Sequence, residues 1–201
     1  MTQAPLMDRI HITEDYDVPR VINGGWQLSA GHALERPLDL ADASRAFNRL
    51  IDMGFDTFDC ADIYTGVEDF FGGIIRERRK AGLRLPQIHT KFVPDLNDLA
   101  NVTPAYIENI ITRSLRRLGV ERLDAVQFHW WDYSVPGMVD VAGELVRLQE
   151  KGLIRLISTT NFNAVELRKL IDAGIPVATN QCQYSVLDRR PAMRLERLCR
   201  E

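Results

Sequence analysis

Short apolar runs and longer amphipathic stretches alternate along this chain. The apolar runs, mostly β-branched or aromatic, predict six strands at Val21–Asn23, Thr57–Asp59, Ile88–Lys91, Ala125–His129, Ile154–Ser158 and Val177–Gln181. They show little strict alternation of apolar and polar residues, which is typical of parallel strands covered on both faces. A small hairpin is expected within residues 7–20, beginning with the segment Arg9–Ile12.

The amphipathic stretches between these strands have apolar residues at helical spacing. They predict helices at Leu40–Met53, Val67–Lys80, Pro104–Leu118, Met138–Lys151 and Asn163–Ala173, and a last helix from near Pro191 to the chain end. Thr103 and Asn163 are expected to cap two of them. Four helices are followed by a glycine, which is expected to adopt the left-handed conformation of a C-cap: Gly54, Gly119, Gly152 and Gly174.

Regular alternation of strand and helix indicates right-handed βαβ crossovers and a parallel sheet. Two architectures fit, an open doubly wound sheet and a (β/α)8 TIM barrel. A doubly wound dinucleotide-binding domain would carry G-x-G-x-x-G after its first strand, and the chain has neither that motif nor a G-x-x-x-x-G-K-[ST] phosphate loop. The pattern therefore favours a single α/β barrel domain over residues 1–201, with about six of the eight βα units.

Composition narrows the class of protein. The chain has 201 residues, of which 45% are hydrophobic and 26% charged, and its formal net charge is −3 with no sustained basic run. No nucleic-acid partner is expected from this. No apolar run approaches the roughly 18–20 residues of a membrane span, no signal peptide is recognisable, and the three cysteines form no C-x-x-C pair. A cytoplasmic protein without a membrane partner is predicted.

Chemically active side chains lie where the predicted strands end. Asp59, Lys91 and His129 end three successive strands, and Tyr64 follows Asp59 in the next loop. In a parallel barrel these ends meet at one mouth. A lysine ammonium lowers the pKa of a nearby tyrosine, a carboxylate can hold that lysine, and a histidine can donate a hydrogen bond to a substrate oxygen. Such a set can protonate a carbonyl that is being reduced, or deprotonate an alcohol that is being oxidised.

Each of these residues also has a structural interpretation. Asp59 and Lys91 fit a plain ion pair, Tyr64 a packing residue and His129 a core histidine. His89, on the same strand face as Lys91, is expected to fill the barrel interior, although it could also tune the lysine. A metal-dependent hydrolase would need histidines clustered at strand ends, and the four in this chain are not arranged in that way: His11, His32, His89 and His129.

Five ordered motifs between Val21 and Arg190 resemble the aldo-keto reductases. The first is Gly54-Phe-Asp-Thr-Phe-Asp59-Cys-Ala-x-x-Tyr64-x-Gly66, followed by Glu68 and Gly72. The others are Thr90-Lys91, Leu123-Asp-Ala-Val-Gln-Phe-His129-Trp130, Ile157-Ser-Thr-Thr160-Asn161-Phe-Asn163 and Asn180-Gln181-x-x-Tyr184-Ser185.

The resemblance implies a reductase of aldehydes or ketones that uses NADPH and no metal. Tyr64 would be the general acid, Lys91 would lower its pKa, Asp59 would be the partner of the lysine, and His129 would orient the carbonyl. The residues implied at the cofactor are Gly25, Trp26, Asp59, Thr160, Asn161 and Gln181, of which Asn161 and Gln181 would hold the nicotinamide carboxamide. The substrate pocket would be lined by Trp26 and Trp130.

The chain departs from the family pattern after its sixth strand, because a complete member has eight. Six strands cannot close an eight-stranded barrel, so the first and sixth would be left as unpaired edges. Three outcomes are expected. The chain is a fragment of a longer reductase, it completes itself by oligomerising or swapping through those edges, or it is a truncated product that folds poorly and binds no cofactor. The alternative function is that of a truncated, catalytically silent barrel that serves as a binding or regulatory subunit or is an inactive remnant.

Overall fold

The computed structural model describes residues 8–30 and 39–201. Its contacts divide the chain into two compact units, which are described separately below. The first unit comprises residues 1–90 and 112–124, and the second comprises residues 91–111 and 125–201. The expectation of one domain over residues 1–201 stays a prediction.

Six strands form a sheet in which spatial order follows chain order. They are β3 (Asn23–Gly24), β4 (Thr57–Asp59), β5 (Gln87–Phe92), β6 (Leu123–Phe128), β7 (Ile154–Thr160) and β8 (Val177–Gln181). The pairs β3–β4, β4–β5 and β7–β8 are parallel. This order is that of consecutive βα units, as the alternating pattern predicts.

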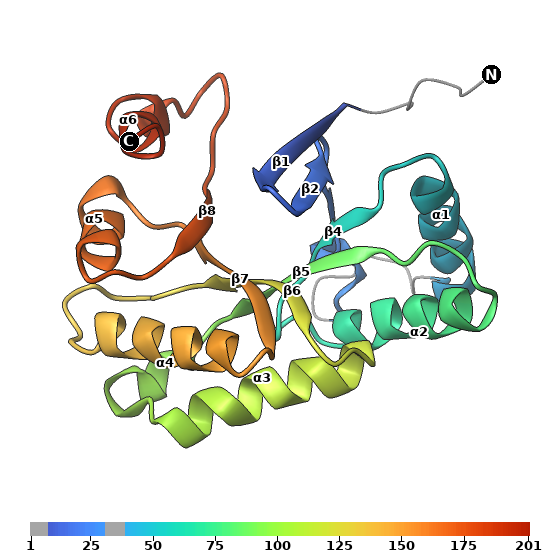
Figure 1. Ribbon diagram of the computed structural model, residues 1–201, viewed down its shortest axis with the longest axis horizontal. Helices are drawn as coiled ribbons and strands as arrows, with labels where there is room; N and C mark the ends of the chain where they lie inside the picture. Colours follow the sequence, from blue (N-terminus) through green and yellow to red (C-terminus); the bar gives the residue numbers. More distant parts are fainter. Residues whose placement is uncertain (1–7, 31–38) are drawn as a thin grey trace. The chain divides into compact units, whose positions relative to one another are not determined.

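Helices follow the strands along the chain (Figure 1). They are α1 (Leu40–Asp52), α2 (Val67–Lys80), α3 (Pro104–Leu118), α4 (Met138–Glu150), α5 (Ala164–Asp172) and α6 (Leu195–Leu198), with short 3₁₀ helices η1 (Trp26–Leu28), η2 (Leu96–Asn101) and η3 (Arg190–Ala192). All four predicted C-cap glycines have positive φ, between 67° and 96°. Thr103 Oγ1 accepts the Tyr106 N–H at 3.2 Å, so that cap is also confirmed.

Four predicted elements, α2, α3, β4 and β8, have the expected bounds, and most of the others shift by one or two residues, so that Lys91 is followed by one more strand residue and His129 lies just outside β6. The first strand is shorter than Val21–Asn23 and begins only at Asn23, where pairing with Phe58 starts. The last helix does not run unbroken from Pro191. The 3₁₀ turn η3 and the one-turn helix α6 replace it, and Arg194 between them has a φ of −125°, outside the helical range.

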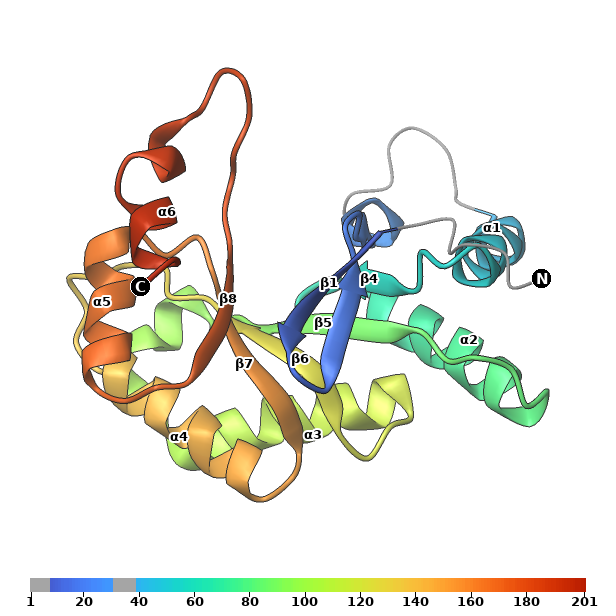
Figure 2. The same ribbon diagram turned by 45° about the horizontal axis from the view of Figure 1, so that its top comes forward.

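The first unit contains an antiparallel hairpin of β1 (Arg9–Thr13) and β2 (Tyr16–Pro19), drawn in blue in Figure 2. The Tyr16 hydroxyl lies 2.9 Å from His89 Nε2, and the two rings stack at 5.9 Å. Both side chains are buried. His89 is therefore an interior residue that binds the hairpin.

The core of the first unit is an aromatic cluster. The Phe47 ring lies 5.0–5.6 Å from those of Phe58, Phe70 and Phe71. These side chains come from α1, β4 and α2, so the cluster fastens both helices to the strand. Edge-to-face contacts of this kind add to the burial of apolar area.

Aromatic rings also pack together in the core of the second unit. Phe128 in β6 lies 6.0 Å from Phe92 and 5.6 Å from Phe162, measured between ring centroids. Leu145 and Leu148 of α4 are buried as well. Helix α6 lies beside α5 in both views (Figures 1 and 2).

Helices α2 and α3 approach closely at Gly72. A Cβ atom at that position would lie 2.1 Å from the carbonyl oxygen of Arg117, a distance that no real side chain tolerates. Only glycine at this position lets the two helices come so near.

We predict that Gly72→Ala destabilises the protein by about 1–3 kcal/mol, because the added methyl group must push α2 away from the Arg117 backbone. The matched control is Gly73→Ala, whose Cβ would meet only Arg76 Nη2, at 3.9 Å. That variant should be neutral, or more stable by up to about 1 kcal/mol through helix propensity. Equal unfolding free energies of the two variants, measured with denaturant, would contradict the close contact.

Candidate active site

Asp59 and Tyr64 belong to the first unit and flank one loop. Asp59 is the last residue of β4, and its carbonyl accepts the Gly25 N–H at 2.8 Å. The chain then turns, with the Tyr64 N–H bonded to the Ala61 carbonyl at 3.1 Å. The Tyr64 side chain is half-buried, and the charge of Asp59 acts on it.

Burial is the main cause that raises the pKa of Tyr64 to about 12, and electrostatic interactions with Asp59 and Cys60 add to it. At neutral pH the phenol is therefore protonated, the form that a proton donor needs. The predicted lowering of this pKa by Lys91 would oppose these effects and stays a prediction.

Gly25 and Trp26 follow β3 in the first unit. A Cβ on Gly25 would lie 2.8 Å from Val67 Cγ1 and 3.1 Å from the Asp59 carbonyl oxygen. Close packing is therefore sufficient to explain why position 25 is a glycine, independently of any ligand. Trp26 is the first residue of η1, and its indole is 46% exposed, so it can contact a ligand.

Lys91 and His129 belong to the second unit. Lys91 is buried in β5 and is 6% exposed, while His129 directly follows β6 and is half-buried. The pKa of His129 is lowered, first by burial and also by the charge of Lys91, and the hydrogen bond to the Thr160 carbonyl partly opposes this. The structure therefore brings the lysine and histidine into electrostatic contact.

The partner of His129 determines where its proton lies. Nδ1 is 3.3 Å from the carbonyl oxygen of Thr160, which can only accept. A neutral ring in this position has its proton on Nδ1, so Nε2 is an acceptor. To donate to a substrate oxygen from Nε2, the ring must carry a second proton or release Thr160.

Three predicted cofactor residues meet where β7 and β8 end. The Asn161 N–H donates to the Gln181 carbonyl at 2.7 Å, and Thr160 Oγ1 lies 3.3 Å from Gln181 Oε1. Asn161 has a φ of +62°, the left-handed region that asparagine tolerates better than most residues. Both the Asn161 and Gln181 side chains are exposed.

The two adjacent tryptophans have different environments. Trp130 is only 1% exposed and donates to the Val135 carbonyl at 3.2 Å, and its place in the wall of the substrate pocket stays a prediction. Trp131 is 48% exposed, and its ring stands edge-to-face on His129 at 4.4 Å. The sequence does not distinguish these neighbours, because only the fold decides which indole turns inward.

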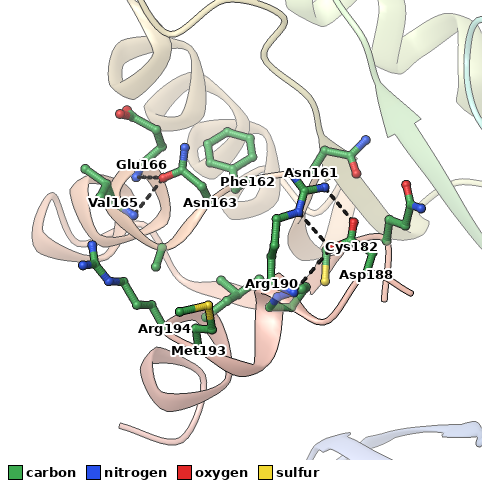
Figure 3. Close-up of a pocket in the computed structure, with 14 residues that line it drawn as sticks. Asn161, Phe162, Asn163, Val165, Glu166, Cys182, Asp188, Arg190, Met193 and Arg194 are labelled. Carbon is green, nitrogen blue, oxygen red and sulfur yellow. Dashed lines mark hydrogen bonds and ion pairs between the residues drawn. The ribbon is translucent and has the colours of Figure 1, made fainter. Parts of the chain in front are cut away.

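A cavity of about 800 Å³ opens at the N-terminus of α5 in the second unit (Figure 3). Asn161 and Cys182 line it, as does Arg190, whose guanidinium is paired with Asp188 at 2.6 Å. Asn163 caps α5 there, and its Oδ1 accepts two backbone N–H groups. A predicted cofactor residue thus lies on a cavity large enough for part of a ligand.

Within residues 8–30 and 39–201, no group of three or more His, Cys, Asp or Glu side chains could hold a metal ion. Cys60, Cys182 and Cys199 form no disulfide in this part of the chain. In the same part of the chain, every helix is too short or too polar to cross a membrane.

Residues 20–201 match the family model of the aldo/keto reductase family. The chain belongs to this family. The prediction of the family from sequence is confirmed.

The curated relatives of this aldo-keto reductase chain are longer than the chain itself. It is 29% identical over 190 residues to methylglyoxal reductase DkgA of Yersinia pestis, covering 93% of this chain and 60% of that protein. It is 28% identical over 213 residues to the NADH-specific methylglyoxal reductase of Escherichia coli (strain K12), covering 94% and 62%. The chain thus spans about three-fifths of the length of these relatives.

The fold agrees with that of a solved aldo-keto reductase. A crystal structure of a thermostable aldo-keto reductase with the inhibitor epalrestat matches with a TM-score of 0.76. The match covers 94% of this chain and 66% of the other, at 22% identity. The predicted barrel-type α/β fold, with about six βα units present, is confirmed.

We predict that His129 titrates below its usual pKa of 6.5 in the folded protein. The unfolded chain then binds that proton more tightly. The stability that His129 contributes is therefore complete above the unfolded pKa and is lost as the pH falls below about 6.5. A nuclear magnetic resonance titration of the ring, repeated in denaturant, checks this. A folded midpoint at or above the unfolded one would refute it.

Proposed function

We propose that this protein is an oxidoreductase that reduces an aldehyde or ketone to an alcohol with a reduced nicotinamide cofactor. Membership of the aldo/keto reductase family, together with a protonated Tyr64 in its Asp59–Tyr64 loop, carries the proposal. A small carbonyl compound is the substrate class. NADPH is the cofactor that the family resemblance implies, and NADH is the competitor because one relative is named NADH-specific.

Tyr64 is the proposed general acid. As the carbonyl group is reduced, the phenol would give its proton to the oxygen, on which negative charge develops. Because an alkoxide is a stronger base than a phenolate, a tyrosine with a pKa of about 12 can still protonate it. The reverse reaction needs the phenolate, which at pH 7 is only about one molecule in 10⁵ at that pKa. At neutral pH, Tyr64 is therefore in the form that can donate the proton.

The other three residues of the set adjust this proton transfer. Lys91 would stabilise the phenolate that remains, since a nearby cation favours the charged form. Asp59 would keep that lysine charged. His129 would orient the substrate oxygen, and Trp131 lies against its ring. Trp26 and Trp130 stay proposed residues of the substrate pocket.

The donor set of the second unit fits a nicotinamide carboxamide. Asn161 and Gln181 present two exposed amide groups at adjoining strand ends, with the Thr160 hydroxyl beside them. An amide ligand needs both donors and acceptors, and these three side chains supply both. When bound there, the cofactor supplies the hydride. Gly25 and Trp26 remain proposed contacts from the first unit.

Cytoplasmic location, absence of a nucleic-acid partner and oligomerisation through strand edges stay predictions. All three are properties of the whole protein in the cell, and the structure of this chain does not test them.

We predict that Tyr64→Phe lowers the turnover number at least about 10²-fold while cofactor affinity changes less than about threefold, because only the transferred proton is lost. The matched control is Tyr106→Phe, which removes a hydroxyl that accepts from the Asp95 N–H. Turnover is measured with a panel of small aldehydes and ketones. If Tyr64→Phe reduces these substrates as fast as the parent protein, Tyr64 is not the general acid.

We also predict that Asn161→Gly weakens binding of NADPH or NADH by about tenfold, because one amide partner is lost. Glycine is chosen since it keeps the left-handed backbone at φ +62°. Fluorescence titration with each cofactor measures the effect and identifies the preferred one. Ile171→Ala, an exposed change near the end of α5 at a residue that does not line the cavity, is the control. Equal affinity of Asn161→Gly and the parent protein would remove Asn161 from the cofactor site.

A further inference from the structure

One arginine of α3 holds both sides of the loop that carries Tyr64. Arg117 Nη1 donates to the Asp62 carbonyl oxygen at 3.1 Å and to Glu68 Oε2 at 3.1 Å. Asp62 lies two residues before Tyr64, and Glu68 lies four residues after it. A single guanidinium therefore bridges the beginning and the end of the segment that contains the proposed acid.

Both residues that Arg117 contacts have buried carboxylates. The side chains of Glu68 and Asp62 are each 1% exposed. Asp62 pairs with Arg113 Nη2 at 3.3 Å, and Glu68 Oε1 accepts the Thr90 hydroxyl at 2.7 Å. Since a buried carboxylate is costly unless it is paired and hydrogen-bonded, the loop cannot shift without exposing or unpairing these charges.

The bond from Thr90 extends the same constraint to β5. Thr90 has no exposed surface and directly precedes Lys91 in that strand. Glu68 therefore joins α2 to the strand that carries the proposed modulator of Tyr64. The close approach of α2 to the Arg117 backbone at Gly72 makes these short contacts possible.

We propose that Asp62, Glu68, Arg113 and Arg117 form a clamp that positions the Tyr64 hydroxyl for proton transfer. These four are positioning residues, and the inference rests on the proposed function of Tyr64. A displacement of about 1 Å, caused far from the reacting atoms, can cost roughly 10²-fold in rate. Holding the loop at both ends is thus sufficient to influence turnover.

Glu68→Gln and Asp69→Asn provide a matched test. Each removes one carboxylate that faces Arg117, but Asp69 lies 3.9 Å from Nε and is 65% exposed. Glu68→Gln should lower the turnover number by about tenfold or more, with the Michaelis constant of the carbonyl changed less than about threefold. Its solvent deuterium isotope effect should rise, because a misplaced donor makes proton transfer limiting. Asp69→Asn should match the parent protein within about twofold in each measurement.

Hydrogen exchange of the backbone amides of residues 62–66 provides a second measurement that does not need activity. Glu68→Gln should accelerate it by about tenfold, and Thr90→Val, which removes only the hydroxyl donor to Glu68, should do so by about threefold. Thr90→Val also serves if Glu68→Gln does not fold. Unchanged exchange and turnover in these variants, or identical effects of Glu68→Gln and Asp69→Asn, would overturn the clamp. If the parent protein reduces no carbonyl compound, the proposed function is contradicted. Faster amide exchange in Glu68→Gln than in the parent protein would still support the clamp in that case.

Discussion

The buried carboxylate of Glu68 determines much of the architecture of the first unit. A charge with 1% exposure must be compensated inside the protein, and Arg117 and Thr90 supply that compensation. Arg117 can do so only because α3 lies close to α2, and Gly72 is the residue that permits this approach. A single electrostatic requirement thereby links two helices, one strand and the loop that carries Tyr64.

The second unit depends on a different constraint: hydrogen bonds of backbone atoms hold the ends of neighbouring strands in place. The left-handed turn at Asn161 directs its N–H to Gln181, and His129 is held through the Thr160 carbonyl. Backbone atoms thus fix the positions of the residues proposed for the cofactor. Their side chains can be changed without dismantling the sheet.

Burial affects the two proposed acid–base groups in the same direction, toward the neutral form. It raises the pKa of Tyr64 and lowers that of His129. A neutral phenol is the form that donates a proton, which agrees with reduction. A neutral imidazole with its proton on Nδ1 does not donate from Nε2, so the role of His129 depends on its protonation or on release of Thr160.

The sequence by itself determined the element order, the bounds of α2, α3, β4 and β8, the four glycine caps and the family. These features depend on periodicity, capping and motif order, which are local. Only the tertiary structure decided that Trp130 is buried while Trp131 meets His129, and that Glu68 binds Arg117 across 49 positions of the chain. Such partners are brought together by packing between distant elements, and no local pattern specifies them.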